Sequence, residues 1–174
     1  MSTFDRAALC AVLALISVAS YGAEPAFKPK SESFDYVKRE EMIAMRDGVK
    51  LKTFILVPKG AKDAPMLLTR TPYNASSRVG RHQSPHLSAV VPQMNDTSAE
   101  AGYIIVYQDV RGKYGSEGEY TMTWPLMGPL NKGKVDHATD TYDTIEWLVK
   151  NVPESNRRVG TIGGSYEEIG RAHV

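Results

Sequence analysis

Apolar residues along this chain occur in short runs that are separated by polar, glycine-bearing sequence. Tyr36 to Met45 and Val49 to Val57 are two strand-like segments, and the Asp-Gly of Arg46-Asp47-Gly48 between them is a strong hairpin-turn signal. Pro65 to Arg70 and Gly102 to Asp109 are continuous apolar runs, which are typical of strands covered on both faces. The pattern therefore predicts an antiparallel pair of strands followed by two buried strands.

The sequence between and after these strands predicts helices and one long loop. Asn74 to Pro92 is rich in Ser, Pro, His and Arg and predicts a loop, whereas Met94 to Ala101 predicts a short helix. Asp140 to Asn151 places apolar residues at helical spacing, with Asp140 available as the N-cap. Arg158 to Ile162 is the last predicted strand. Strands that alternate with helices after a hairpin predict an α/β fold with a mixed, mainly parallel sheet and helices on its faces.

The N-terminus has the pattern of an export signal. Arg6 precedes an apolar run from Ala7 to Val18, and small residues follow at positions suited to cleavage. The run is shorter than the roughly 20 apolar residues that span a bilayer, so no stable membrane anchor is expected. We predict a signal peptide over residues 1–22, a linker over 23–35 and a domain over 36–174, in a periplasmic or secreted protein.

The charge balance and the single cysteine narrow the chemistry. The chain has 21 basic and 20 acidic residues and a net charge of +1, so it carries no electrostatic footprint for nucleic acid, and a small molecule is the expected partner. Cys10 lies inside the predicted signal peptide, which leaves a mature chain without cysteine for a disulfide or a metal site. No HExxH or EF-hand spacing is present. We expect a site without metal or cofactor, whose nucleophile is an oxygen.

A candidate nucleophile follows the last predicted strand. Gly163-Gly164-Ser165 places a serine where a sharp turn between a strand and a helix would lift its hydroxyl above the sheet. Small residues flank such a turn because the backbone is strained and neighbouring strands leave little room for a Cβ. The alternative is an ordinary loop, since the G-x-S-x-G pattern is incomplete: Glu167 occupies its last position.

Five segments occur in the order and at the spacing of one known family. They are Arg46 to Leu51, Arg70 to Tyr73, Asp109 to Gly118, Asp143 to Trp147 and Gly163 to Glu167. With them the chain resembles the X-prolyl dipeptidyl peptidase-like hydrolases, the family of cocaine esterase and glutaryl-cephalosporin acylase, and within it the α-amino acid ester hydrolases. The DVRGxxxSxG block is the specific part. The resemblance implies the N-terminal part of an α/β-hydrolase fold, truncated after the nucleophile elbow.

The resemblance also implies roles for three residues. Ser165 would attack the carbonyl of an ester or amide and form an acyl-enzyme. The backbone N–H of Tyr166 and the hydroxyl of Tyr73 would hold the oxyanion. The Asp and His of the triad follow the serine in this fold, and we expect both to be absent from this chain, because His173 is the only later histidine and lies eight residues on.

The implied substrates are α-amino acid esters or β-lactam side-chain amides. An X-Pro dipeptidyl peptidase or a general carboxylesterase of the same family is the alternative, and a truncated non-catalytic product or pseudoenzyme is another. Glu168 stands where the family has Gly, and residues 169–174 do not resemble the apolar helix that follows. Half of a parallel sheet that ends at the elbow would leave its last strand without an outer neighbour and with apolar surface exposed, so we expect the chain alone to be poorly soluble. We also expect it to have little or no esterase activity. A homo-oligomer of the full-length parent stays open.

Other charged and aromatic residues allow both a structural and a functional interpretation. We expect Asp109 and Arg111 to form a buried ion pair or to support the glycine-rich turn after their strand. Trp124, Tyr114 and Tyr120 could either line a pocket or pack down their loop. The sequence leaves that choice open.

Overall fold

The computed structural model describes residues 34–80, 82–164 and 167. The predicted signal peptide, most of the predicted linker, Ser165, Tyr166 and His173 lie outside the described residues. Within the described part of the chain, no helix has the length and apolar character needed to cross a membrane.

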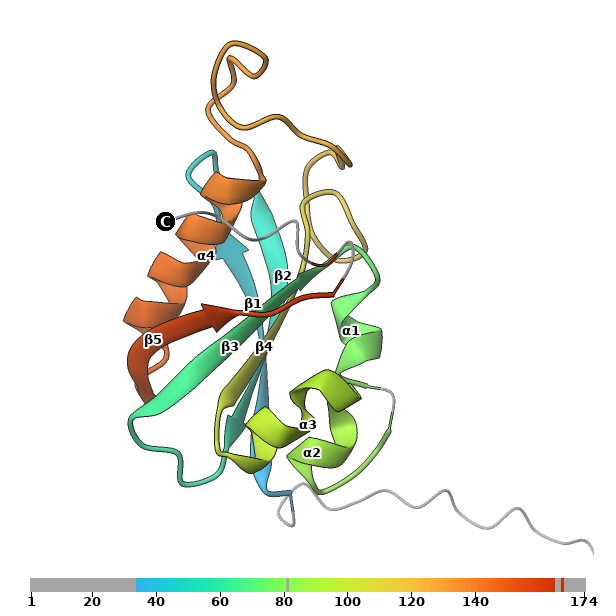
Figure 1. Ribbon diagram of the computed structural model, residues 1–174, viewed down its shortest axis with the longest axis vertical. Helices are drawn as coiled ribbons and strands as arrows, with labels where there is room; N and C mark the ends of the chain where they lie inside the picture. The colour runs from blue at the N-terminus through green and yellow to red at the C-terminus, as the bar shows by residue number, and fades with distance from the viewer. Residues whose placement is uncertain (1–33, 81, 165–166, 168–174) are drawn as a thin grey trace, which may run out of the picture.

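A five-stranded mixed sheet forms the centre of the fold, with the strand order β1-β2-β4-β3-β5 (Figure 1). The strands are β1 (Tyr36–Ala44), β2 (Lys50–Pro58), β3 (Ala64–Thr71), β4 (Ile104–Asp109) and β5 (Ser155–Thr161). Strand β2 pairs antiparallel with both β1 and β4, whereas β3 pairs parallel with both β4 and β5. The predicted α/β fold and its mixed sheet are confirmed.

The predicted hairpin between the first two strands is also confirmed. Ala44 pairs with Lys50, and the N–H of Met45 donates to the carbonyl of Val49 over 2.8 Å. Gly48 has a φ of 87°, a left-handed conformation that glycine adopts without a Cβ penalty. The Asp-Gly pair therefore acts as the turn that its sequence predicts.

Helices cover both faces of the sheet, as Figure 1 shows. They are α1 (Ala75–Arg78), α2 (Leu87–Val90), α3 (Gln93–Glu100) and α4 (His137–Asn151). Helices α1 to α3 pack on one face against residues that include Ile105 and Tyr107, and α4 packs on the other against Ile104 and Val106. Successive side chains of β4 point to opposite faces, so this strand is buried on both, as its continuous apolar run predicts.

Two predictions about helices were wrong. The predicted loop from Asn74 to Pro92 contains α1 and α2, each a single short turn that packs apolar residues on the sheet. The long helix begins at His137, with Asp136 rather than Asp140 as its N-cap. Asp136 accepts from the N–H of Thr139 over 2.7 Å, and the Thr139 hydroxyl accepts from the N–H of Asp136 over 2.8 Å. Threonine stands where a capping box usually has Glu or Gln, so the start was hard to recognise.

Candidate active site

The parallel strands β3, β4 and β5 end at one edge of the sheet, and the sequence-predicted site residues follow two of them. Tyr73 lies just after β3, and Gly163-Gly164 lies just after the neighbouring β5. The N–H of Ile162 still donates to the carbonyl of Leu68 over 3.0 Å, which extends the pairing of β5 toward the glycines. In open α/β sheets, ligands bind outside the carboxyl ends of the strands. The edge is therefore where a site is expected.

The segment around the predicted nucleophile is closed by a backbone hydrogen bond. The N–H of Glu167 donates to the carbonyl of Gly164 over 3.2 Å, which joins the described residues on either side of 165–166. Among the described residues, the atom nearest to a Cβ at position 164 would be the Cε of Met94, at 3.8 Å, which is an ordinary van der Waals contact.

Tyr73 is placed at the strand ends as an exposed residue. Its backbone N–H donates to the hydroxyl of Thr71 over 3.0 Å, and 49% of its surface is exposed. The guanidinium carbon of Arg78, in the last turn of α1, lies 5.9 Å from the centre of its ring. The structure therefore brings Tyr73 to the strand next to the elbow, while Ser165 and Tyr166 lie outside the described residues.

Glu167 is a buried acidic residue that sequence reasoning missed. Only 7% of it is exposed, and its Oε1 accepts from the Thr71 hydroxyl and from Nη2 of Arg78, each over 2.8 Å. Thr71 uses both capacities of its hydroxyl, since it donates to Glu167 and accepts from Tyr73. The one signal in the sequence was a charged residue in the last position of the incomplete G-x-S-x-G pattern.

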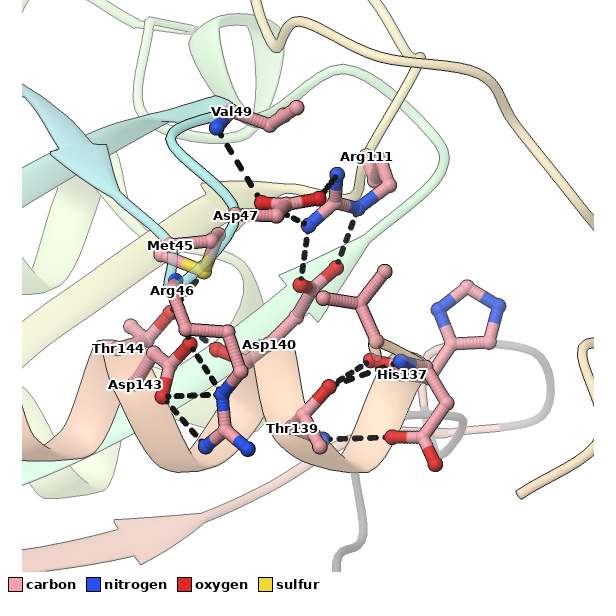
Figure 2. Close-up of polar contacts among 12 residues, drawn as sticks. Met45, Arg46, Asp47, Val49, Arg111, His137, Thr139, Asp140, Asp143 and Thr144 are labelled. Atoms are coloured by element: carbon pink, nitrogen blue, oxygen red, sulfur yellow. Dashed lines mark hydrogen bonds and ion pairs between the residues drawn. The ribbon is translucent and has the colours of Figure 1, made fainter. Parts of the chain in front are cut away.

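Arg111 joins two acidic residues rather than Asp109 (Figure 2). Its Nε and Nη2 donate to Asp140 over 3.0 and 2.6 Å, and its Nη1 and Nη2 donate to Asp47 over 2.7 and 3.1 Å. Burial opposes the charges of Arg111 and Asp47, but their mutual hydrogen bonds prevail, so the pKa of Arg111 is raised and that of Asp47 is lowered. The predicted buried ion pair exists with different partners, because Asp109 instead accepts from the N–H of Ala75 over 2.7 Å.

This ion-pair cluster ties three segments together. Asp47 belongs to the β1–β2 turn, Arg111 to the loop after β4, and Asp140 to the first half of α4. The loop after β4 also needs its glycine, since Gly112 has a φ of 69° and a Cβ there would lie 2.2 Å from the backbone nitrogen of Tyr120. The ion pairs of Arg111 and the backbone conformation of Gly112 therefore give the DVRG block a structural role.

Arg70 of the Arg-Thr-Pro-Tyr segment is likewise structural. Its Nη1 donates to the carbonyl of His137 and to the Thr141 hydroxyl, over 2.8 and 2.7 Å, so it holds the start of α4 to β3. Its Nη2 lies 3.7 Å from Asp140 Oδ2. Burial lowers the pKa of Arg70 to about 10, which leaves it charged at neutral pH.

In the part of the chain that the structure describes, no histidine ring nitrogen is hydrogen-bonded to a residue at the carboxyl ends of β3 or β5. His82 and His86 are exposed, and Nδ1 of His86 lies 3.2 Å from an oxygen of Asp35. His137 is buried, and burial lowers its pKa. Its Nε2 lies 2.9 Å from the carbonyl oxygen of Thr121, and its ring meets Trp124 edge-on at 5.7 Å. Trp124 therefore packs its loop onto the fold.

Tyr114 and Tyr120 lie in the loop after β4, as Trp124 does. Lys113 Nζ lies 4.1 Å from the ring centre of Tyr120, while Tyr114 is 63% exposed.

Across residues 34–80, 82–164 and 167, no three His, Cys, Asp or Glu side chains are grouped so that they could hold a metal ion.

Comparison with known proteins identifies relatives of this arrangement. Residues 47–169 match the family described as X-Pro dipeptidyl-peptidase (S15 family). Cocaine esterase of Rhodococcus sp. (strain MB1 Bresler) is 31% identical over 126 residues, which are 72% of this chain and 18% of that protein. A solved α-amino acid ester hydrolase is 59% identical, with a TM-score of 0.78 over 87% of this chain and 25% of its own.

A second solved structure is similar to the same extent. An aminopeptidase from the marine sediment archaeon Thaumarchaeota archaeon is 64% identical, with a TM-score of 0.78, and the match covers 88% of this chain and 25% of that one. The chain thus spans a quarter or less of the length of these relatives.

Proposed function

Because this chain belongs to the X-Pro dipeptidyl-peptidase (S15) family of hydrolases, we propose that it carries the nucleophile of a serine hydrolase that acts on α-amino acid esters and amides. The observation that carries this proposal is the placement of Tyr73 and Gly163-Gly164 at the ends of adjacent parallel strands. A nucleophile and an oxyanion donor from neighbouring strand ends are what acyl transfer requires.

The proposed reaction has two halves. The Ser165 hydroxyl attacks the substrate carbonyl and transfers its proton to a base, and the tetrahedral oxyanion is held by the N–H of Tyr166 and the hydroxyl of Tyr73. Collapse expels the alcohol or amine, which takes up a proton, and leaves the acyl group on Ser165. Water then releases the acid by the same path. The Asp and His that activate the serine come after it in the order of this fold.

The substrate class rests on the names of two relatives. An α-amino acid ester hydrolase and an aminopeptidase, at 59% and 64% identity, differ in whether an ester or an amide is cleaved, but both names describe an aminoacyl substrate. We therefore propose an aminoacyl group on the acyl side, including the side-chain amides of β-lactams. An amide-cleaving peptidase that prefers a residue linked to proline is the second candidate, because the matched family is described by that activity.

The direct test is covalent labelling. The protein, expressed from its complete coding sequence, is treated with a fluorophosphonate probe, and the adduct is located by tandem mass spectrometry. We expect a single adduct on the peptide that contains Ser165. An active protein whose adduct lies on another residue, or a folded protein that takes up no probe, would contradict the proposal; the second result would favour a non-catalytic product.

Replacing Tyr73 with phenylalanine tests the second oxyanion donor. Loss of one such donor lowers kcat by about 10²- to 10³-fold because the stabilisation exists mainly in the transition state. We expect a decrease of that size for an α-amino acid ester, with KM nearly unchanged, from steady-state kinetics. Tyr142→Phe is a matched control, since Tyr142 is also 49% exposed and lies 5.8 Å from Arg46. An equal decrease in both variants would remove Tyr73 from the site.

A further inference from the structure

The carboxylate of Glu167 is buried where β3 and β5 end, at 7% exposure. A buried carboxylate is unfavourable unless it is paired and hydrogen-bonded. Glu167 has both kinds of partner, since it accepts from the uncharged hydroxyl of Thr71 and from the cationic Arg78. Hydrogen bonds to an ionised group are the shorter and stronger ones, so this carboxylate is held firmly.

Both partners of the Glu167 carboxylate also contact Tyr73. The Thr71 hydroxyl that donates to Glu167 accepts from the backbone N–H of Tyr73 over 3.0 Å. The Arg78 guanidinium that donates to Glu167 also lies over the Tyr73 ring, 5.9 Å from its centre. The backbone and the ring of the tyrosine are thus connected to one carboxylate by separate routes.

The backbone of Glu167 is hydrogen-bonded next to the proposed nucleophile. Its N–H donates to the carbonyl of Gly164, so Glu167 is bonded to the residue that precedes Ser165 in the chain. We propose that Glu167 is a positioning residue: its carboxylate sets the segment that carries Ser165 against the segment that carries the oxyanion donor Tyr73. This inference rests on the proposed function.

The effect on catalysis follows from the geometry of acyl transfer. An oxyanion donor works only when it lies at hydrogen-bond distance from the oxygen that develops charge, so the separation of Ser165 and Tyr73 must be right when substrate is bound. A misplacement of about 1 Å can cost about a hundredfold in rate. Glu167 acts on that separation through Thr71 and Arg78, which distinguishes it from a residue that contributes only to stability.

The test compares Glu167→Gln with Glu154→Gln in the protein expressed from its complete coding sequence. Glutamine keeps an oxygen that can accept from Thr71 but loses the charge that Arg78 pairs with. Glu154 is the matched control, because it pairs with Arg39, which joins β1 to the start of β5. We expect E167Q to lower kcat for an α-amino acid ester by about 10- to 100-fold with KM changed less than about threefold, and E154Q to leave both unchanged.

Thr71→Val is the second variant, and it carries the test alone if E167Q does not fold. It removes the hydroxyl that connects Glu167 to Tyr73 and leaves the Arg78 pair in place. We expect T71V to lower kcat by about 10- to 100-fold with KM changed less than about threefold, because the connection to the backbone of Tyr73 is lost. A T71V variant that folds and keeps the full kcat would overturn the inference.

The proposed function can fail separately from this inference. A wild-type protein that neither hydrolyses the ester nor takes up the fluorophosphonate probe contradicts the proposed function. An active wild type whose E167Q variant keeps its kcat, or loses activity only in proportion to the fraction unfolded in circular dichroism, contradicts the positioning role and leaves the function standing.

Discussion

Replacement of Ser165 by alanine is expected to lower kcat for an α-amino acid ester by about 10⁶-fold, the size of effect that removal of a serine nucleophile has in other hydrolases. The reason is that alanine has no atom that can form the acyl-enzyme. S165A would keep the proposed oxyanion donors, so we expect only the small residual catalysis that such donors give without a nucleophile. Initial rates of acid release, measured by chromatography, give the ratio.

Ser76→Ala is the control for this substitution, because Ser76 is an exposed serine on α1. We expect S76A to hydrolyse the ester at the wild-type rate. An S165A variant that keeps more than about a thousandth of the wild-type kcat would show that another group is the nucleophile.

The largest effect on stability is expected from Arg111→Met. Only 5% of the Arg111 side chain is exposed, and Asp140, at 0%, would lose both of its short hydrogen bonds to it. Arg70 Nη2, at 3.7 Å, would be the remaining cation near Asp140. Removing one partner of a buried ion pair costs about 3–5 kcal/mol because the other charge stays buried without compensation. We expect a loss of that size in the free energy of unfolding in urea, followed by circular dichroism.

Arg46→Met is the matched control for Arg111→Met. Arg46 also donates hydrogen bonds from two guanidinium nitrogens to one aspartate, Asp143, but its side chain is 39% exposed. Asp143 would keep its hydrogen bond from the backbone N–H of Arg46, at 2.9 Å, in the variant. Exposed pairs contribute about 0–1 kcal/mol, so R46M should lie within that range. Equal losses of unfolding free energy in the two variants would mean that the Asp47–Arg111–Asp140 cluster contributes no more to stability than an exposed ion pair.

Local patterns were enough to predict the strands and the mixed sheet that they form. The hairpin follows from Asp47-Gly48, because only a few residues tolerate the left-handed backbone of such a turn. Strand β4 follows from its dense apolar run, Ile104 to Tyr107, because a strand covered on both faces shows no polar side there. Helix α3 was predicted nearly to its ends. These signals need only neighbours in the chain.

The start of α4 could not be read in the same way. Asp140 is a good N-cap residue by type, but its carboxylate is taken up by Arg111, 29 positions earlier. Likewise, the sequence marked Asp109 and Arg111 as neighbours with opposite charge, whereas they bond to different segments. Sequence adjacency indicates which charges are present and not which charges meet.

By itself the sequence determined the α/β class. Through its resemblance to a family it also predicted a nucleophile elbow after the last strand and the roles proposed for Ser165 and Tyr73. These depend on residue type, on periodicity and on order along the chain. Only the tertiary structure decided that Glu167 contacts Thr71 and Arg78, which lie 96 and 89 positions away in the chain, and that Arg111 joins a hairpin turn to a helix. The physical reason is that an exposed charge can be solvated by water, whereas a buried carboxylate is unfavourable unless it is paired and hydrogen-bonded. Which partner it has therefore depends on the residues that folding brings next to it.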